Sequence, residues 1–168
     1  MATGTIIMIK LIEDNMMYSC IQLMHKSTQD NNYQPYERNE RCWIQHLGKH
    51  IEEQANNNPR FIAIGDYTDT GELKGFMLAS AFQTYYTNEM VMDVKDCIVN
   101  HDYNNSFTVS RLFNYMIDHV KRHGGSHWRA DSIRAGDKAV EYTEFLAKKY
   151  NAKPFHGVHG RIEQEITK

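Results

Sequence analysis

Apolar residues along this chain follow two different periods, and the order in which the two periods alternate limits the folds available to it. Apolar and β-branched runs typical of strands cover residues 5–12, 60–66, 73–82, 89–99 and 128–133. Apolar residues recur every three or four positions, as in helices, over residues 16–26, 38–56, 108–123 and 137–150. Polar loops are expected at 27–37 and 100–106, and a closing hairpin at 153–167. The order predicts an α/β (α+β) fold, a single domain over residues 1–168 with a mixed central sheet flanked by helices.

The charge balance excludes some classes of partner. The chain has 19 Lys and Arg against 21 Asp and Glu, a formal charge of −2. Nucleic acids and anionic membranes are bound by proteins with a basic excess, so neither is expected as a partner. No apolar run approaches the roughly 20 residues of a membrane span, and the N-terminus lacks a leader pattern. We therefore expect a cytoplasmic protein.

Metal and disulfide chemistry are also not expected. Cys20, Cys42 and Cys97 are far apart and form no CxxC pair, which favours reduced thiols. Two histidine pairs have the i, i+4 spacing of metal ligands on a helix: His46 with His50, and His119 with His123. Neither pair has the glutamate of an HExxH motif, so we predict no metal site.

Two segments resemble a known family. Residues 97–133 (CIVNHDYNNSFTVSRLFNYMIDHVKRHGGSHWRADSI) resemble the acyl-CoA motif of the Gcn5-related N-acetyltransferase (GNAT) superfamily, and residues 142–155 (YTEFLAKKYNAKPF) are similar to its later helix and the following turn. The order of strands and helices extends the resemblance over nearly the whole chain. It implies the acyl-CoA N-acyltransferase fold, an N-acetyltransferase activity and acetyl-CoA as cofactor.

The resemblance also implies where the cofactor binds. Backbone N–H groups of a loop and of the helix after it hold the pyrophosphate in this family. The corresponding residues are Cys97, Ile98, Val99, Asn104, Asn105, Ser106, Phe107, Val109 and Ser110. The family pattern of Arg or Gln, then Gly, then Gly or Ala is replaced by Asn104, Phe107 and Val109. A Cβ at the last two positions obstructs close approach of the backbone, so acetyl-CoA is expected to bind weakly or to have been lost.

The catalytic residues are less clearly indicated. The family often uses a tyrosine to return a proton to the thiolate, and its position falls on Ala147. Tyr142 and Tyr150 lie on the same predicted helix at other angular positions. A carboxylate on a central strand often serves as the base. Three such residues lie on the third meander strand, where exposure to water is the simpler interpretation of each: Glu89, Asp93 and Asp96.

Two functions stay open at this point. One is an acetyltransferase in which backbone N–H groups near residues 97–99 polarise the thioester carbonyl. The other is a structural or adaptor protein that keeps the fold without the cofactor and docks a partner through mixed aromatic and polar segments at 33–41, 85–86 and 128–129. For that case we expect self-association or a place in a larger assembly. Short, Asn- and Tyr-rich chains of this kind are similar to GNAT-like proteins of tailed bacteriophages, which suggests a host-cell or virion location.

Overall fold

The predicted elements are present, with changed ends. The computed structural model describes residues 8–30, 40–83, 89–100, 102–103, 105–130, 139–154 and 162–165. The helices are η1 (Asp14–Met16), α1 (Met17–Asp30), α2 (Glu40–Ala55), α3 (Asn105–Arg122) and α4 (Ala139–Tyr150). The strands are β1 (Met8–Leu11), β2 (Phe61–Tyr67), β3 (Leu73–Gln83), β4 (Met90–Val99), β5 (His127–Ala130), β6 (Lys153–Pro154) and β7 (Ile162–Glu165).

Two predicted loop boundaries are wrong. Helix α1 continues to Asp30, through the start of the segment expected to be a loop at 27–37. Helix α3 begins at Asn105, three residues before the predicted start, so Asn105 and Ser106 are helical. Both errors arose because polar residues near a helix end were taken as loop, although the neighbouring apolar stripe is enough to hold another turn.

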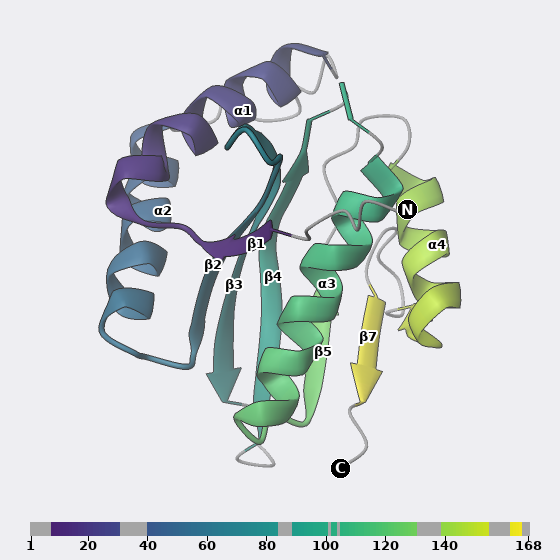
Figure 1. Ribbon diagram of the computed structural model, residues 1–168. Coiled ribbons are helices and arrows are strands. Elements are labelled where there is room, and N and C mark those ends of the chain that lie inside the picture. Colours follow the sequence, from purple (N-terminus) through teal and green to yellow (C-terminus); the bar gives the residue numbers. More distant parts are fainter. Residues whose placement is uncertain are drawn as a thin grey trace, which may run out of the picture.

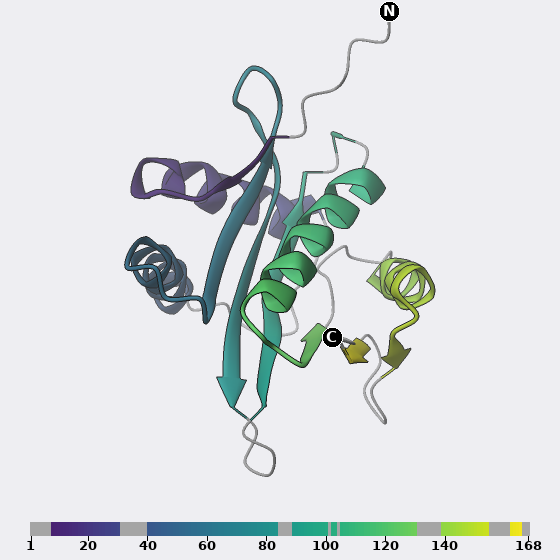
Figure 2. The same cartoon turned by 60° about the horizontal axis from the view of Figure 1, so that its bottom comes forward.

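One mixed sheet lies between two layers of helices. Its order is β1-β2-β3-β4-β5-β7-β6, and β4 with β5 is its parallel pair. Helices α1 and α2 lie on one face, and α3 and α4 on the other (Figures 1 and 2). The closing hairpin is confirmed as the antiparallel pair β6 and β7. None of the helices described is long and apolar enough to cross a membrane.

Each face of the sheet carries its own core. Under α3, the apolar stripe of that helix packs on the sheet, and Phe113 meets the fully buried Trp128 edge to face with ring centroids 5.3 Å apart. Under α1 and α2, Trp43 and Leu47 pack on Phe76 of β3. Side chains alternate across a strand, so β2, β3 and β4 supply residues to both cores.

Strand β4 contains a bulge that changes which side chains share a face. Leu78 pairs with Asp96 and the next residue of β3 pairs with Val94, which leaves Lys95 as an extra residue. Val94 and Cys97 therefore both face the α3 core, although three positions separate them. By the same shift, Asp93 and Asp96 both face the side of α1 and α2.

Candidate functional site

The described residues of β5 pair with only the first half of β4. Their parallel pairing runs from Val91 with His127 to Val94 with Ala130 and ends at the bulge. Beyond that point β4 continues for five residues, paired with β3 on one side only in the part of the chain that the structure describes. The segment includes the predicted cofactor residues Cys97, Ile98 and Val99, whose side chains are buried. This segment of β4 is therefore the candidate ligand-binding edge.

The N-terminus of α3 follows the end of β4 closely. The first N–H groups of a helix lack intrahelical acceptors and lie at the positive end of its dipole, which suits an anion. Asn105 and Ser106 form the start of this 18-residue helix. Phe107 is 62% exposed, whereas Val109 is fully buried in the α3 core. The Val109 side chain therefore points to the sheet and does not cover the helix N-terminus. Asn104 lies outside the described residues.

A glycine of β3 brings this helix close to the sheet. A Cβ at Gly75 would lie 2.7 Å from Cγ2 of Thr108 and 3.0 Å from the carbonyl oxygen of Ile98. The absence of a side chain at Gly75 thus allows the first turns of α3 to pack directly on β3 and β4. Our sequence analysis missed this residue, although a glycine inside a strand pattern is a signal of such a close approach.

The three candidate carboxylates have different surroundings. Asp96 is buried, and Nε1 of Trp43 donates a hydrogen bond to its Oδ2 at 3.0 Å. Asp93 is also buried and pairs with Lys95 and Arg129. The interpretation as exposed strand carboxylates is therefore wrong for both. Glu89 is exposed, lies before the start of β4, and has Oε2 3.8 Å from Nδ1 of His127. Only Asp96 lies beyond the bulge, in the candidate ligand-binding segment of β4.

Tyr150 is held against α3. Its Oη lies 2.6 Å from Oδ1 of Asn114 and 3.3 Å from the carbonyl oxygen of Ser110, a buried residue. Its ring packs on Phe113 and Trp128, and burial raises the pKa of its hydroxyl to about 12. This arrangement makes Tyr150 a tether between α4 and α3. Nothing is described of the Tyr142 side chain, which stays a candidate.

A buried ion pair joins α3 to strand β2 of the sheet. Asp66 of β2 is fully buried, and its Oδ2 accepts hydrogen bonds from Nε of Arg111 at 2.9 Å and from Nη2 of the same residue. Nζ of Lys74 lies 3.7 Å from Oδ1 of Asp66. The cluster fixes α3 across β2 and β3. Sequence analysis did not predict it, because the aspartate and arginine are 45 residues apart.

Comparison with known proteins finds similarity in structure. No family model and no curated protein matches the sequence. An acetyltransferase of the GNAT family from Staphylococcus aureus Mu50 superposes with a TM-score of 0.73 and 9% identity, over 96% of this chain and 99% of that one. PaiA N-acetyltransferase from Thermoplasma acidophilum, in complex with coenzyme A, superposes with a TM-score of 0.71 and 14% identity. The match covers 95% of this chain and 99% of that one. This chain has the GNAT fold. A glucosamine-6-phosphate N-acetyltransferase from Arabidopsis thaliana, with a TM-score of 0.62 at 14% identity over 84% of this chain and 88% of that one, also has this architecture.

The turn after α4 fits the GNAT fold without the glycine that the family pattern has there. Asn151 adopts a left-handed conformation with φ of 51°, and the N–H of Ala152 bonds to the carbonyl oxygen of Ala147 at 2.9 Å. Asparagine tolerates this conformation better than other residues with a side chain. Ala147, where the sequence resemblance puts the acid tyrosine, is partly buried against the α3 core.

Cysteines and histidines behave mostly as packing residues. All three cysteines are free, as predicted. Burial raises the pKa of Cys20 and of Cys97 to about 12, so both thiols are protonated near neutral pH. In the described ranges, no three His, Cys, Asp or Glu side chains are grouped to hold a metal ion. The rings of His46 and His50 contact each other with centroids 4.3 Å apart.

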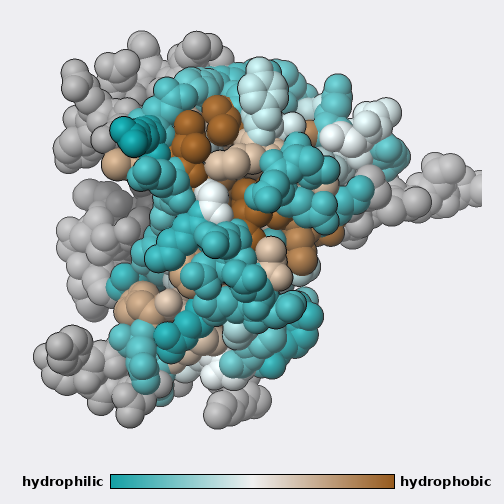
Figure 3. All heavy atoms as spheres, turned by 90° about the vertical axis from the view of Figure 1, so that its left-hand side faces the viewer, coloured by the Kyte–Doolittle hydropathy of each residue, from teal (hydrophilic) through white to brown (hydrophobic). Residues whose placement is uncertain are grey.

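The predicted aromatic docking surface is only partly visible. Trp128 is fully buried, so its inclusion in that surface is wrong, since it alternates with the outward-facing Arg129. Residues 31–39 and 84–88 lie outside the described ranges. On the side of α1 and α2, apolar side chains gather near the centre among hydrophilic ones (Figure 3), and Met17, Ile21 and Ile44 are partly buried there.

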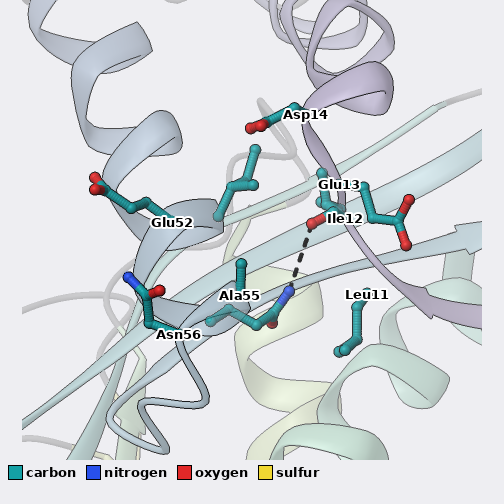
Figure 4. A pocket seen from close by; sticks show the side chains of 9 residues that line it. Leu11, Ile12, Glu13, Asp14, Glu52, Ala55 and Asn56 are labelled. Carbon is teal, nitrogen blue, oxygen red and sulfur yellow. Dashed lines mark hydrogen bonds between the residues drawn. The ribbon is translucent and has the colours of Figure 1, made fainter.

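A separate hollow lies far from the candidate ligand-binding edge of β4. It measures about 480 Å³ and lies between β1, η1 and the end of α2, at the β1 edge of the sheet. Figure 4 shows the carboxylates of Glu13, Asp14 and Glu52 around it, and the bond of 3.5 Å from Nε2 of Gln54 to the carbonyl oxygen of Ile12. Strands β2 and β3 lie between β1, at this hollow, and β4, at the candidate site.

Proposed function

We propose that this protein is an acetyl-CoA-dependent N-acetyltransferase. The observation that carries the proposal is the position of the α3 N-terminus, separated by five residues from the end of β4 and next to the part of β4 that pairs with β3 alone among the described residues. This arrangement puts unpaired helix N–H groups and the candidate ligand-binding edge on one ligand path. The GNAT fold and a structural neighbour in complex with coenzyme A support it.

Coenzyme A fits the backbone of the site. The N–H groups at the start of α3, from Asn105 to Thr108, would hold its pyrophosphate. The missing glycines do not block them, because Val109 is turned into the core and the backbone of Phe107 does not have a positive φ. When bound, acetyl-CoA supplies a thioester that an amine can attack. The candidate ligand-binding edge at residues 97–99 would orient its carbonyl oxygen.

Asp96 is our candidate for the base. Asp93 is already paired with two cations, and Glu89 lies at the opposite end of β4. The amine proton would pass to Asp96 as nitrogen bonds to the acetyl carbon, and the carbon–sulfur bond then breaks, releasing a thiolate that takes up a proton. Trp43 orients the carboxylate of Asp96 by its N–H donation. Tyr150 is held by α3, so Tyr142 is the remaining tyrosine candidate for the proton donor.

Calorimetric titration with acetyl-CoA tests the proposal. We expect a dissociation constant of about 0.1–1 mM. This is weaker binding than at a site with an arginine and two glycines, because the phosphates here meet only backbone donors. If no heat of binding is detected at millimolar acetyl-CoA, the proposed acetyltransferase function is excluded. Desulfo-CoA serves as the control ligand, because it keeps the pyrophosphate and lacks the thioester.

A second candidate function is a GNAT-fold binding protein without cofactor. The exposed Phe107, at a position where the family pattern has glycine, favours it. The self-association, the larger assembly and the bacteriophage virion role that accompany this candidate stay predictions. Light scattering on the purified protein separates them from a monomeric enzyme: a stable oligomer that binds no acetyl-CoA supports the second candidate.

A further inference from the structure

Two cations share one buried carboxylate at the β4 bulge. Nε and Nη2 of Arg129 lie 3.2 and 3.3 Å from the two oxygens of Asp93, and Nζ of Lys95 contacts its Oδ2. The guanidinium of Arg129 also lies over the ring of Phe82, with Cζ 4.3 Å from the centroid. Stacking on a ring and pairing with a carboxylate fix the plane of an arginine side chain. Arg129 is therefore held in one orientation.

The cluster carries one uncompensated positive charge that solvent reaches. The side chain of Asp93 is 5% exposed, whereas those of Arg129 and Lys95 are 31% and 38% exposed. The cations thus cover the carboxylate and present their outer donors on the face of α1 and α2. The cluster stands beside the last residues that pair β4 with β5, at the entrance to the candidate site.

Neighbouring groups on α2 experience this charge. Burial and, after it, the charges of Lys95 and Lys49 lower the pKa of His46, so the imidazole stays neutral near pH 7. His50 is neutral for the same reasons, with burial dominant. Two carboxylates of this part of the chain lie on either side of the cluster: Glu89 before β4, beside His127, and Asp96 beyond the bulge, beside Trp43. The positive charge of the cluster thus lies a few residues before the carboxylate of Asp96 along β4.

We propose that the acceptor amine also carries an anionic group, a carboxylate or a phosphate, which Arg129 and Lys95 bind while the amine lies beside Asp96. The inference rests on the proposed function. Asp93 pairs with Ser80 and Asp96 with Leu78, two positions apart on β3, so the bulge at Lys95 leaves a rise of roughly 7 Å between the two carboxylates' positions. The amine and the anionic group of the acceptor are accordingly several bonds apart, as in an ω-amino acid or a short acidic peptide.

Matched amines test this charge requirement. The probes are 6-aminohexanoate, 5-aminopentyl phosphate and 6-aminohexanamide, in which an uncharged amide replaces the anionic group. We expect kcat/KM with acetyl-CoA to be about tenfold or more higher for an anionic probe than for the amide, the effect of one charge-assisted hydrogen bond. Preference for the carboxylate over the phosphate, or the reverse, identifies the kind of anion.

Substitutions assign the preference to the cluster. In Arg129→Gln and in Lys95→Gln the ratio of kcat/KM between 6-aminohexanoate and the amide should fall severalfold toward one. Arg129→Lys keeps the charge and should retain part of the ratio, which separates recognition from folding. Arg122→Gln is the matched control, because Arg122 is an exposed arginine at the far end of α3.

Binding of the probes alone keeps this inference separate from the proposed function. Calorimetry without acetyl-CoA should show 6-aminohexanoate binding more tightly than the amide to the natural chain and equally to Arg129→Gln. That result supports the anion site even where no acetyl transfer is detected. The acetyl-CoA titration separately tests whether the protein is an acetyl-CoA-dependent enzyme. Equal binding of the charged and neutral probes to the natural chain overturns the inference.

Discussion

At the scale of single residues, a buried histidine should make the protein sensitive to acid. His50 is 1% exposed, Nδ1 donates to the carbonyl oxygen of His46 at 2.8 Å, and Nε2 has no hydrogen-bond partner among the described residues. Burial lowers its pKa from 6.5 to about 4. In the unfolded chain the imidazole takes up a proton below about pH 6.5, whereas in the folded protein it does so only near pH 4.

The folding free energy should therefore fall as pH falls from about 6.5 to 4, by up to about 3 kcal/mol from this residue alone. Above pH 6.5 the residue is neutral in both states and adds no pH dependence. Urea unfolding at several pH values measures the slope. His50→Leu should reduce the slope, and the part due to His46 and His119, whose pKa values burial also lowers, should remain. A slope as steep in His50→Leu as in the natural chain contradicts the assignment.

At the scale of elements, Gly75 controls how closely α3 packs. In Gly75→Ala the new Cβ would meet backbone as well as side-chain atoms within 3.0 Å, so the first turns of α3 must shift. We expect a loss of about 1–3 kcal/mol in unfolding free energy. The affinity for acetyl-CoA should also fall, because the shift moves the N-terminus of α3, where we propose that the pyrophosphate binds.

Gly48→Ala is the matched control for that substitution. A Cβ at Gly48, inside α2, would lie 3.6 Å from Cε of Met17, an ordinary contact. Alanine is the better helix former, so this variant should gain about 0.5–1 kcal/mol. Chemical denaturation of both variants, with acetyl-CoA titration of each, decides the comparison. Equal effects on the two proteins would refute a special role for Gly75.

Elements were predictable from sequence where local periodicity determines them, whereas contacts between side chains of different elements were not. The stripe of α3 and the hairpin of β2 and β3 follow from apolar spacing. The bulge at Lys95 also left a signal, since apolar alternation on β4 breaks between Val94 and Cys97. The pairing of Asp93 with Arg129 depends instead on which strands lie side by side. Single-sequence patterns carry no information on such contacts, so the carboxylates were taken as exposed.

At the scale of the whole molecule, the two cores should unfold together. They lie on opposite faces of one sheet and share β2, β3 and β4, whose alternate side chains belong to one core or the other. Loss of either core would leave the other with one exposed sheet face, a state in which the buried apolar area is roughly halved. A separately stable half is therefore not expected.

The chain's two tryptophans report on the two cores separately. Trp43 is in the core under α1 and α2, and Trp128 is in the core under α3. In Trp43→Phe the fluorescence follows only the α3 core, and in Trp128→Phe only the opposite one. In each variant the fluorescence midpoint in urea should coincide with that of the same variant's far-ultraviolet circular dichroism, because the shared strands cannot lose one core alone. Separate midpoints within one variant would mean that the faces unfold independently and that the sheet does not couple α2 to α3.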